Sequence, residues 1–291
     1  MQSETEGIMR VVSFGTNTTY AALGQGTWRM GVDLNLFTHE VKMLQEGIQH
    51  NLRVIDTAAM YADGGAERVV GQAIQSCRDD VFVVTKVWPT HANYEGVITS
   101  LKNSLDRLNT AYVDLFLLHW PSKQYPLQET MRAMVTVYEK GWAKSLGVSN
   151  FNVELLRQAQ QFLGNIPLVA NQVEYSLTAR AAEHSVIPYC QDHNITVMAY
   201  SPIKHLNALD PHGPQRLLLR ELASKYHSTE HVIALAWVIR QPQVIAIPKA
   251  SQREHLLTNL SALTLDLSPD DEKRLDTLFP PSSHDLTIKW L

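Results

Sequence analysis

Short apolar runs alternate with longer amphipathic segments along most of this 291-residue chain. Eight such runs recur, at residues 23–26, 53–56, 81–86, 113–118, 143–148, 168–173, 195–200 and 244–248. Several lack polar residues at alternate positions, which is typical of strands buried on both faces of a parallel sheet. Eight strands that alternate with helices predict an α/β fold, a closed (β/α)8 TIM barrel. A doubly wound open sheet is the alternative that this pattern leaves open.

The segments between the runs have helical spacing and recognisable helix ends. Asn93, Asn152 and Ser268 are predicted N-caps, and Gly141 is predicted to end the helix before it. Residues 11–14 and 18–22, which precede the repeat, predict a β-hairpin that closes the bottom of the barrel. Because no linker or low-complexity tract interrupts the pattern, we expect residues 1–291 to form a single domain.

Composition narrows the class of protein. The net charge is −4 and basic residues do not cluster, so no nucleic-acid partner is expected. The longest apolar stretches, such as 232–239, are far shorter than the roughly 18 residues of a membrane span, and residues 1–7 lack a signal-peptide pattern. Cys77 and Cys190 form no metal-binding or C-x-x-C spacing, which predicts free thiols and a cytoplasmic protein without a metal. A largely solvated surface favours a monomer.

Polar residues at the ends of three neighbouring runs are the candidates for chemistry. Asp56, Lys86 and His119 close the second, third and fourth runs, and Tyr61 lies just beyond Asp56. Barrel enzymes place their active sites at the carboxyl ends of the strands, so these side chains are expected at one rim. Taken singly, the aspartate could cap a turn, and the histidine and tyrosine could be packing residues. The lysine is harder to explain structurally, because lysine is rarely buried without a partner.

The four residues suit the reduction of a carbonyl, which needs a hydride at carbon and a proton at oxygen. A tyrosine phenol has an unperturbed pKa near 10. A cation about 4 Å away could lower that pKa by as much as ~3 units. Lys86 is therefore predicted to make Tyr61 a general acid, with Asp56 holding Lys86 in place. His119 is predicted to orient the substrate oxygen through a hydrogen bond.

Seven motifs in register resemble the aldo/keto reductase superfamily, most closely its bacterial methylglyoxal-reductase-like members. They extend over almost the whole chain: Asp56-Thr57-Ala58-Ala59-Met60-Tyr61, Thr85-Lys86-Val87-Trp88, Leu117-Leu118-His119-Trp120-Pro121, Gly147-Val148-Ser149-Asn150-Phe151, Asn171-Gln172-Val173-Glu174-Tyr175, Tyr200-Ser201-Pro202 and Ile247-Pro248-Lys249. The resemblance implies a reductase of small aldehydes, ketoaldehydes or ketones that uses NADPH, with NADH as the alternative cofactor.

The resemblance also implies a set of cofactor and substrate contacts. Ser149, Asn150 and Gln172 would hold the nicotinamide carboxamide, and Tyr200 would stack on its ring. The remaining cofactor contacts would be Gly26, Thr27, Trp28 and Asp56 near the nicotinamide ribose, Ser201 and Pro202 at the pyrophosphate, Lys249, Ala250 and His255 at the 2′-phosphate, and Asn259 at the adenine. Trp28, Trp88 and Trp120, with Tyr61 and His119, would contact the substrate.

The chain departs from the family pattern in two places. Ala250 and His255 stand where many members have a serine and an arginine that bind the 2′-phosphate. Arg253 and His255 are therefore the candidates to supply the missing positive charge. The segment 61–67 is longer than the corresponding loop of many members, which predicts a reshaped loop beside the substrate. The tail 280–291 often folds over the pocket in the family, and a loosely ordered tail is the alternative here.

Other classes of protein fit this sequence less well. A Rossmann dehydrogenase would need G-x-G-x-x-G after the first strand. Gly24 and Gly26 match the first two glycines, but Arg29 stands where the third glycine should be. A phosphate-binding isomerase barrel would not bind a nicotinamide. A catalytically weak, cofactor-binding regulatory or sensing subunit stays open as the alternative function, because an intact set of catalytic residues does not exclude it.

Overall fold

The protein is described by a computed structural model that covers residues 9–291. Residues 1–7, in which the sequence shows no signal-peptide pattern, lie outside the described residues. Eight parallel strands form one sheet in the order β10-β9-β8-β7-β6-β5-β4-β3. Their bounds are β3 (Gln25–Gly26), β4 (Val54–Asp56), β5 (Phe82–Val87), β6 (Val113–Leu118), β7 (Ala143–Ser149), β8 (Leu168–Glu174), β9 (Thr196–Tyr200) and β10 (Val244–Ala246).

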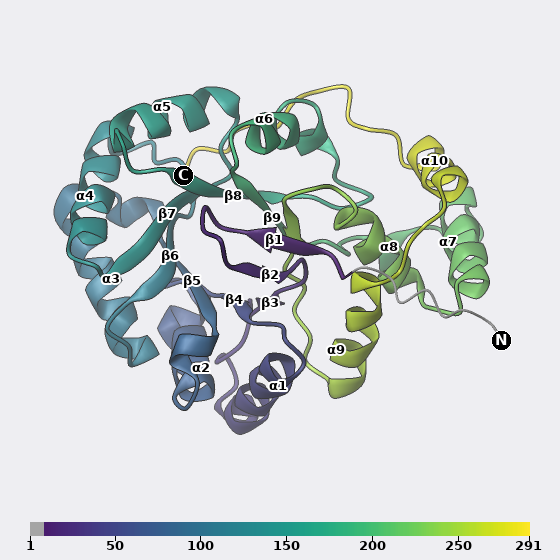
Figure 1. Ribbon diagram of the computed structural model, residues 1–291, viewed down its shortest axis with the longest axis horizontal. Coiled ribbons are helices and arrows are strands. Elements are labelled where there is room, and N and C mark those ends of the chain that lie inside the picture. The colour runs from purple at the N-terminus through teal and green to yellow at the C-terminus, as the bar shows by residue number, and fades with distance from the viewer. Residues whose placement is uncertain (1–8) are drawn as a thin grey trace.

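The sheet closes on itself. Leu23, just before β3, forms a parallel bridge with Ala246 of β10, and backbone hydrogen bonds join Gly24 N–H to Ala246 and Gly26 N–H to Pro248. The closed barrel, with helices arranged around its outside in Figure 1, confirms the predicted (β/α)8 fold. The predicted strands match those observed to within one or two residues, because their apolar side chains are buried as the sequence pattern implied.

The helices surround the barrel with their apolar faces inward. They are α1 (Phe37–Gln49), α2 (Gly65–Ile74), α3 (Tyr94–Leu108), α4 (Leu127–Glu139), α5 (Val153–Leu163), α6 (Val186–Asp192), α7 (Pro214–Lys225), α8 (Glu230–Val238), α9 (Arg253–Leu260) and α10 (Pro269–Leu278). Asn93, Asn152 and Ser268 cap α3, α5 and α10 through side-chain hydrogen bonds, as predicted. Gly141 follows the end of α4 with a φ of 70°, which explains the glycine there. Among residues 9–291, no helix is both long and apolar enough to span a lipid bilayer.

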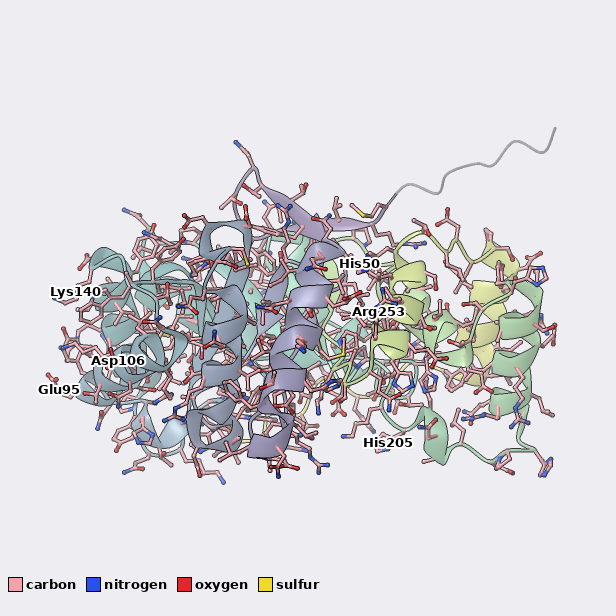
Figure 2. The ribbon with its side chains drawn as sticks, turned by 90° about the horizontal axis from the view of Figure 1, so that it is seen from below. His50, Glu95, Asp106, Lys140, His205 and Arg253 are labelled. Atoms are coloured by element: carbon pink, nitrogen blue, oxygen red, sulfur yellow. The ribbon has the colours of Figure 1, made fainter. Side chains whose placement is uncertain are left out.

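The predicted N-terminal hairpin is present and covers the amino-terminal end of the barrel. β1 (Val11–Ser13) pairs antiparallel with β2 (Thr19–Ala21). Phe14 stacks on Phe82 with ring centroids 4.4 Å apart, and Thr196 donates a hydrogen bond to the Ser13 carbonyl. Phe82 and Thr196 begin their strands, so the hairpin plugs the bottom. In Figure 2 the hairpin lies at one end of the barrel, and His205, which follows β9, lies at the other.

Two features near the C-terminus were not evident from the sequence. The connection from β9 to β10 contains two helices, α7 and α8, and Trp237 of α8 is fully buried. The tail crosses to the far side of the barrel, as Figure 1 shows, and ends beside the segment that follows β6. There, Lys123 N–H donates to the Leu291 carbonyl at 2.9 Å and Leu291 N–H donates to the Pro121 carbonyl at 3.2 Å.

Candidate active site

The barrel brings the four candidate catalytic residues to the carboxyl ends of three adjacent strands. Asp56 ends β4, Lys86 lies near the end of β5, and His119 directly follows β6. Tyr61 begins the short helix η2 (Tyr61–Gly64), five residues beyond Asp56. β4, β5 and β6 are neighbours in the sheet, so the spacing along the sequence becomes proximity in space.

Lys86 is the centre of this arrangement. Its side chain is fully buried, and its Nζ lies 2.8 Å from Asp56 Oδ1, 2.8 Å from the Thr57 carbonyl and 3.3 Å from Tyr61 Oη. A fourth side chain joins them, since Gln172 Nε2 donates to Asp56 Oδ1 at 2.7 Å. Asp56, Tyr61, Lys86 and Gln172 are called the Lys86 cluster below. Every charged group in it has an opposite charge or a hydrogen-bond partner, as burial requires.

The protonation of the cluster follows from burial and charge. Burial on its own lowers the pKa of Lys86, but the facing Asp56 carboxylate and Tyr61 outweigh it and raise that pKa above its ordinary value. Burial raises the pKa of Tyr61, and Lys86 opposes this without overcoming it. The net direction for Tyr61 is opposite to the prediction from the sequence, which weighed the cation but not the loss of solvent. Tyr61 is therefore a protonated phenol beside an ammonium at neutral pH.

His119 completes the rim above Tyr61. Burial and the nearby Lys86 hold the pKa of His119 well below its ordinary value, so the ring is neutral near pH 7. Its ring lies edge-on to Tyr61, with centroids 5.8 Å apart, and edge-on to Trp88, at 5.1 Å. Within the described part of the chain, His119 Nδ1 is buried without a hydrogen-bond partner. A neutral imidazole can donate one hydrogen bond and adds no charge to the site.

The ends of β7, β8 and β9 supply a second polar group next to the Lys86 cluster. Asn150 Nδ2 donates to the His119 carbonyl at 3.1 Å, and Tyr200 Oη donates to Asn150 Oδ1 at 3.0 Å. Ser149 Oγ donates to the Gln172 carbonyl at 2.8 Å. Asn150 is held in the left-handed region with a φ of 63°, a conformation that asparagine tolerates better than most residues. These amides and hydroxyls are fixed in place by one another.

These residues surround a cavity of about 660 Å3 at the carboxyl end of the barrel. Its wall contains most of the residues expected at the site, namely Gly26, Trp28, Asp56, Tyr61, Trp88, His119, Trp120, Ser149, Asn150, Gln172, Tyr200, Ser201, Pro202 and Lys249. The tryptophans and the lysines enter the wall from different segments. The three tryptophans follow β3, β5 and β6, whereas Lys204 and Lys249 follow β9 and β10.

Four of the expected cofactor contacts lie off this cavity. Thr27 is fully buried, and its hydroxyl donates to the Asp56 carbonyl at 2.9 Å. Ala250 and Asn259 line a small adjoining cleft that also contains Gly26 and Pro248. His255 is exposed on α9. Arg253, the other candidate to replace the missing arginine, pairs with Glu46 of α1 at 2.9 Å, and Figure 2 shows it beside that helix.

The sequence by itself assigned no role to several residues of the cavity wall, which are Met60, Ile203, Lys204, Asn207, His231 and Ile247. Met60 and Ile247 lie inside the motifs quoted above, and Ile203 directly follows one of them. Lys204 and Asn207 lie in the loop behind Ser201. His231 carried no signal, because it lies on α8, whose approach to the cavity depends on the long β9–β10 connection.

Known proteins of one family resemble this chain over most of its length. The profile of the aldo/keto reductase family matches residues 22–279. Methylglyoxal reductase YeaE of Escherichia coli is 38% identical over 271 residues, covering 93% of this chain and 95% of its own. Glyoxal reductase of Bacillus subtilis is 31% identical over 242 residues, covering 81% and 82%.

Solved structures agree in fold as well as in sequence. An aldo/keto reductase from Klebsiella pneumoniae, solved in complex with NADP and acetate, is 40% identical with a TM-score of 0.89. The match covers 98% of this chain and 100% of that one. A family profile that spans most of the barrel, together with relatives that match over nearly their whole length, shows that this chain belongs to the aldo/keto reductase family.

Proposed function

We propose that this protein is a single-domain, NADPH-dependent reductase of small, uncharged aldehydes and ketones, including methylglyoxal-like ketoaldehydes. The observation that carries the proposal is the contact of the Tyr61 hydroxyl with the buried Lys86 ammonium, at 3.3 Å, in the wall of an open cavity. A phenol, an ammonium and a carboxylate in this order can donate a proton to a substrate in the cavity. A cluster of the same groups that served only the fold would not need to face a cavity.

Each residue of the unit has a separate task in this proposal. Tyr61 holds the proton that the carbonyl oxygen needs, and its burial keeps that proton in place until the substrate arrives. Lys86 stabilises the phenolate that remains when the proton leaves, and Asp56 keeps Lys86 charged and oriented. His119, which is neutral, donates a hydrogen bond to the same oxygen and so fixes which face of the carbonyl is presented.

The donor groups around the cavity fit a nicotinamide dinucleotide phosphate. Ser149, Asn150 and Gln172 offer amides and hydroxyls for a carboxamide, and Tyr200 offers a ring for stacking. Lys249 offers positive charge for phosphates at the other side of the cavity, where Lys204 also lies but pairs with Glu174 at 2.9 Å. When bound there, the cofactor supplies the hydride. The NADP complex of the Klebsiella pneumoniae relative, at 40% identity, supports this choice of cofactor.

The wall near Tyr61 favours an uncharged substrate. Trp28, Trp88 and Trp120 line it, and Lys86 already has Asp56 as its partner. Of the described residues in the wall, those contributed by the segments after β3 to β6 include no arginine and no lysine that could pair with a substrate carboxylate. A buried carboxylate without a partner costs several kcal/mol, so anionic carbonyls should be rejected.

Turnover with a matched pair of aldehydes tests both the reaction and the substrate class. Oxidation of NADPH is followed with methylglyoxal, with methyl 4-formylbenzoate and with 4-carboxybenzaldehyde, which differs from the ester only in its free carboxylate. We expect turnover of the first two and a kcat/KM at least about tenfold lower for the acid. If none of the three carbonyls causes oxidation of NADPH, the proposal that the protein is a reductase is wrong. If acid and ester react at equal rates, the proposed preference for uncharged substrates is wrong.

A further inference from the structure

The backbone directly after Tyr61 follows an unusual path. Ala62, Asp63 and Gly64 have φ values of 50°, 49° and 81°, so three consecutive residues occupy the left-handed region. Residues other than glycine avoid this region because Cβ approaches the carbonyl oxygen. Such strain persists only where the surrounding structure imposes it, and it gathers at functional sites.

Two close contacts impose this path. A Cβ atom on Gly64 would lie 2.3 Å from Cδ of Arg107, and a Cβ atom on Gly31 would lie 2.4 Å from the carbonyl carbon of Gly65. The turn is therefore pressed between the loop that follows β3 and a side chain of α3. At Gly31 the backbone of Gly65 leaves no room for a methyl group, and at Gly64 a methyl group would displace the Arg107 side chain.

Arg107 is itself held by a buried acid. Its Nε lies 2.6 Å from Oε2 of Glu67, a side chain with no solvent exposure, and its guanidinium also donates to Ser104 Oγ at 3.2 Å. The other oxygen of Glu67 accepts a hydrogen bond from Thr85 Oγ1 at 2.6 Å. Thr85 directly precedes Lys86 in β5, and alternate residues of a strand face opposite sides. The Glu67 contact is thus on the outer face of the barrel wall, and the Lys86 cluster is on the inner face.

We propose that Arg107 and Glu67 are positioning residues that hold the Tyr61 hydroxyl against Lys86. The pair joins the turn after Tyr61 to the strand that carries Lys86, so it sets the distance between the two groups from outside the barrel. Neither residue lines the cavity in the described part of the chain. The inference rests on the proposed function, because it assigns these two residues to the proton-donating step of that reaction.

The expected effect is on the chemical step and not on binding. A displacement of about 1 Å at a reacting group can cost roughly a hundredfold in rate. We expect Arg107→Met and Glu67→Gln to lower kcat about tenfold to a hundredfold, with the KM for methylglyoxal and the Kd for NADPH changed less than about twofold. Arg107→Lys, which keeps the charge, should recover part of the rate.

A matched control separates positioning from general stability. Arg78 also forms an ion pair with an acid, 2.8 Å from Asp114, and its side chain is 14% exposed against 20% for Arg107. Asp114 lies in the first half of β6, away from the cavity end. Arg78→Met should lower stability while leaving kcat per folded molecule unchanged.

Two readouts decide between the roles. If Arg107 positions Tyr61, Arg107→Met should raise the primary kinetic isotope effect on kcat, measured with NADPH deuterated at the transferred position, because the chemical step becomes slower. Deuterium exchange of the backbone amides at 58–66 should also become faster in Arg107→Met than in Arg78→Met. The inference would be overturned if Arg107→Met lost no more rate than Arg78→Met and left the isotope effect unchanged. Arg107 would then only stabilise the fold.

The inference can still be tested if Arg107→Met does not fold or if the wild-type protein shows no activity. If Arg107→Met does not fold, Thr85→Val removes only the hydroxyl that binds Glu67, and the inference then requires a slower kcat with a raised isotope effect in that variant. If the wild-type protein reduces no carbonyl, the proposed function fails by itself. The exchange comparison then still decides whether Arg107 holds the turn, and equal exchange in the two variants refutes that.

Discussion

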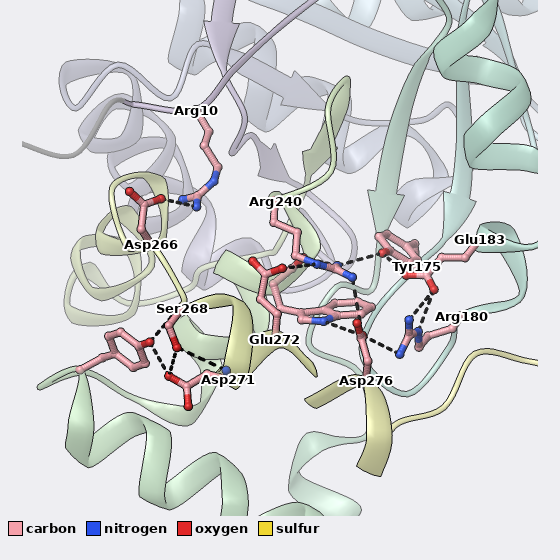
Figure 3. A network of polar contacts seen from close by, with 12 residues as sticks. Arg10, Tyr175, Arg180, Glu183, Arg240, Asp266, Ser268, Asp271, Glu272 and Asp276 are labelled. Atoms are coloured by element: carbon pink, nitrogen blue, oxygen red, sulfur yellow. Dashed lines mark hydrogen bonds and ion pairs between the residues drawn. The ribbon is translucent and has the colours of Figure 1, made fainter. Parts of the chain in front are cut away.

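Two groups of paired charged side chains, one fully buried and one partly buried, use similar chemistry for different ends in this molecule. The Lys86 cluster faces a cavity at the carboxyl end of the barrel. The second group, called the Trp237 cluster and drawn in Figure 3, consists of Arg180, Arg240, Trp237 and Asp276 and lies where α8 meets α10. Arg180 and Arg240 lie over the Trp237 ring at 4.7 Å and 3.9 Å.

The difference between the clusters is what their polar groups face. In the Trp237 cluster, Arg180 pairs with Glu183 at 2.6 Å and with Asp276 at 2.9 Å and also binds the Phe279 carbonyl, so protein groups surround it. In the Lys86 cluster, the Tyr61 hydroxyl has a partner on one side and the cavity on the other. Burial and ion pairing are thus common to both, and access to a cavity is what distinguishes a candidate for chemistry from a structural clamp.

The largest expected effect comes from the Lys86 cluster. Tyr61→Phe removes only the phenolic oxygen, so we expect turnover to fall by about 10²- to 10⁴-fold, the usual contribution of a general acid. Affinity for NADPH, measured by fluorescence titration, should stay within about twofold, since no phosphate or amide contact is lost. Near-normal turnover in this variant would show that another group donates the proton.

The Trp237 cluster should give the opposite result. Arg180→Met removes the guanidinium that pairs with both Glu183 and Asp276, which then keep only their contacts with Tyr175, Trp237 and Arg240. We therefore expect the free energy of unfolding to fall by about 3 kcal/mol in urea denaturation. Turnover per folded molecule should be unchanged, because Arg180 does not line the cavity in residues 9–291. A lower kcat with unchanged stability would erase the distinction between the two clusters.

A third polar group, close to the Trp237 cluster in Figure 3, adds a dependence on pH. Burial alone would raise the pKa of Asp271, but hydrogen bonds from Lys225, Tyr226 and Ser268 hold that pKa well below its usual range. A carboxyl whose pKa is lowered by folding stabilises the fold above the unfolded pKa, near 4, and loses this contribution as the pH falls. Asp271→Asn should lower stability by about 1 to 3 kcal/mol at pH 7. The deficit relative to the wild type should shrink below pH 4, and a constant deficit down to pH 2 would contradict this explanation.

The smallest expected effect concerns the cationic side of the cavity. Lys249 is exposed there, so Lys249→Ala should weaken NADPH binding by roughly tenfold and NADH binding much less, because only NADPH carries a 2′-phosphate. Arg253→Ala tests the other basic candidate for the 2′-phosphate. Because Arg253 pairs with Glu46 of α1, we expect this variant to weaken NADPH binding less than Lys249→Ala does. Equal losses for both cofactors in Lys249→Ala would show that Lys249 does not recognise the phosphate.

Local sequence pattern was sufficient to predict much of the fold and the identity of the residues at the strand ends, but not their protonation. The apolar runs, the N-caps Asn93, Asn152 and Ser268, and the residues at the strand ends could all be read within windows of a few residues. The pKa of Tyr61 could not, because its direction depends on how much solvent the folded barrel removes. The α7–α8 insertion was missed for a similar reason. A fully buried helix such as α8 has no polar face, so it shows no amphipathic spacing.

By itself, the sequence determined which segments become strands and helices and which polar residues stand at the strand ends, because hydrophobic periodicity and capping act between near neighbours in the chain. Only the tertiary structure decided which further residues contact them. Gln172 reaches Asp56 across 116 residues, and Arg107 reaches Glu67 across 40. Such contacts depend on closure of the barrel and on how helices pack against its wall, which no local spacing encodes.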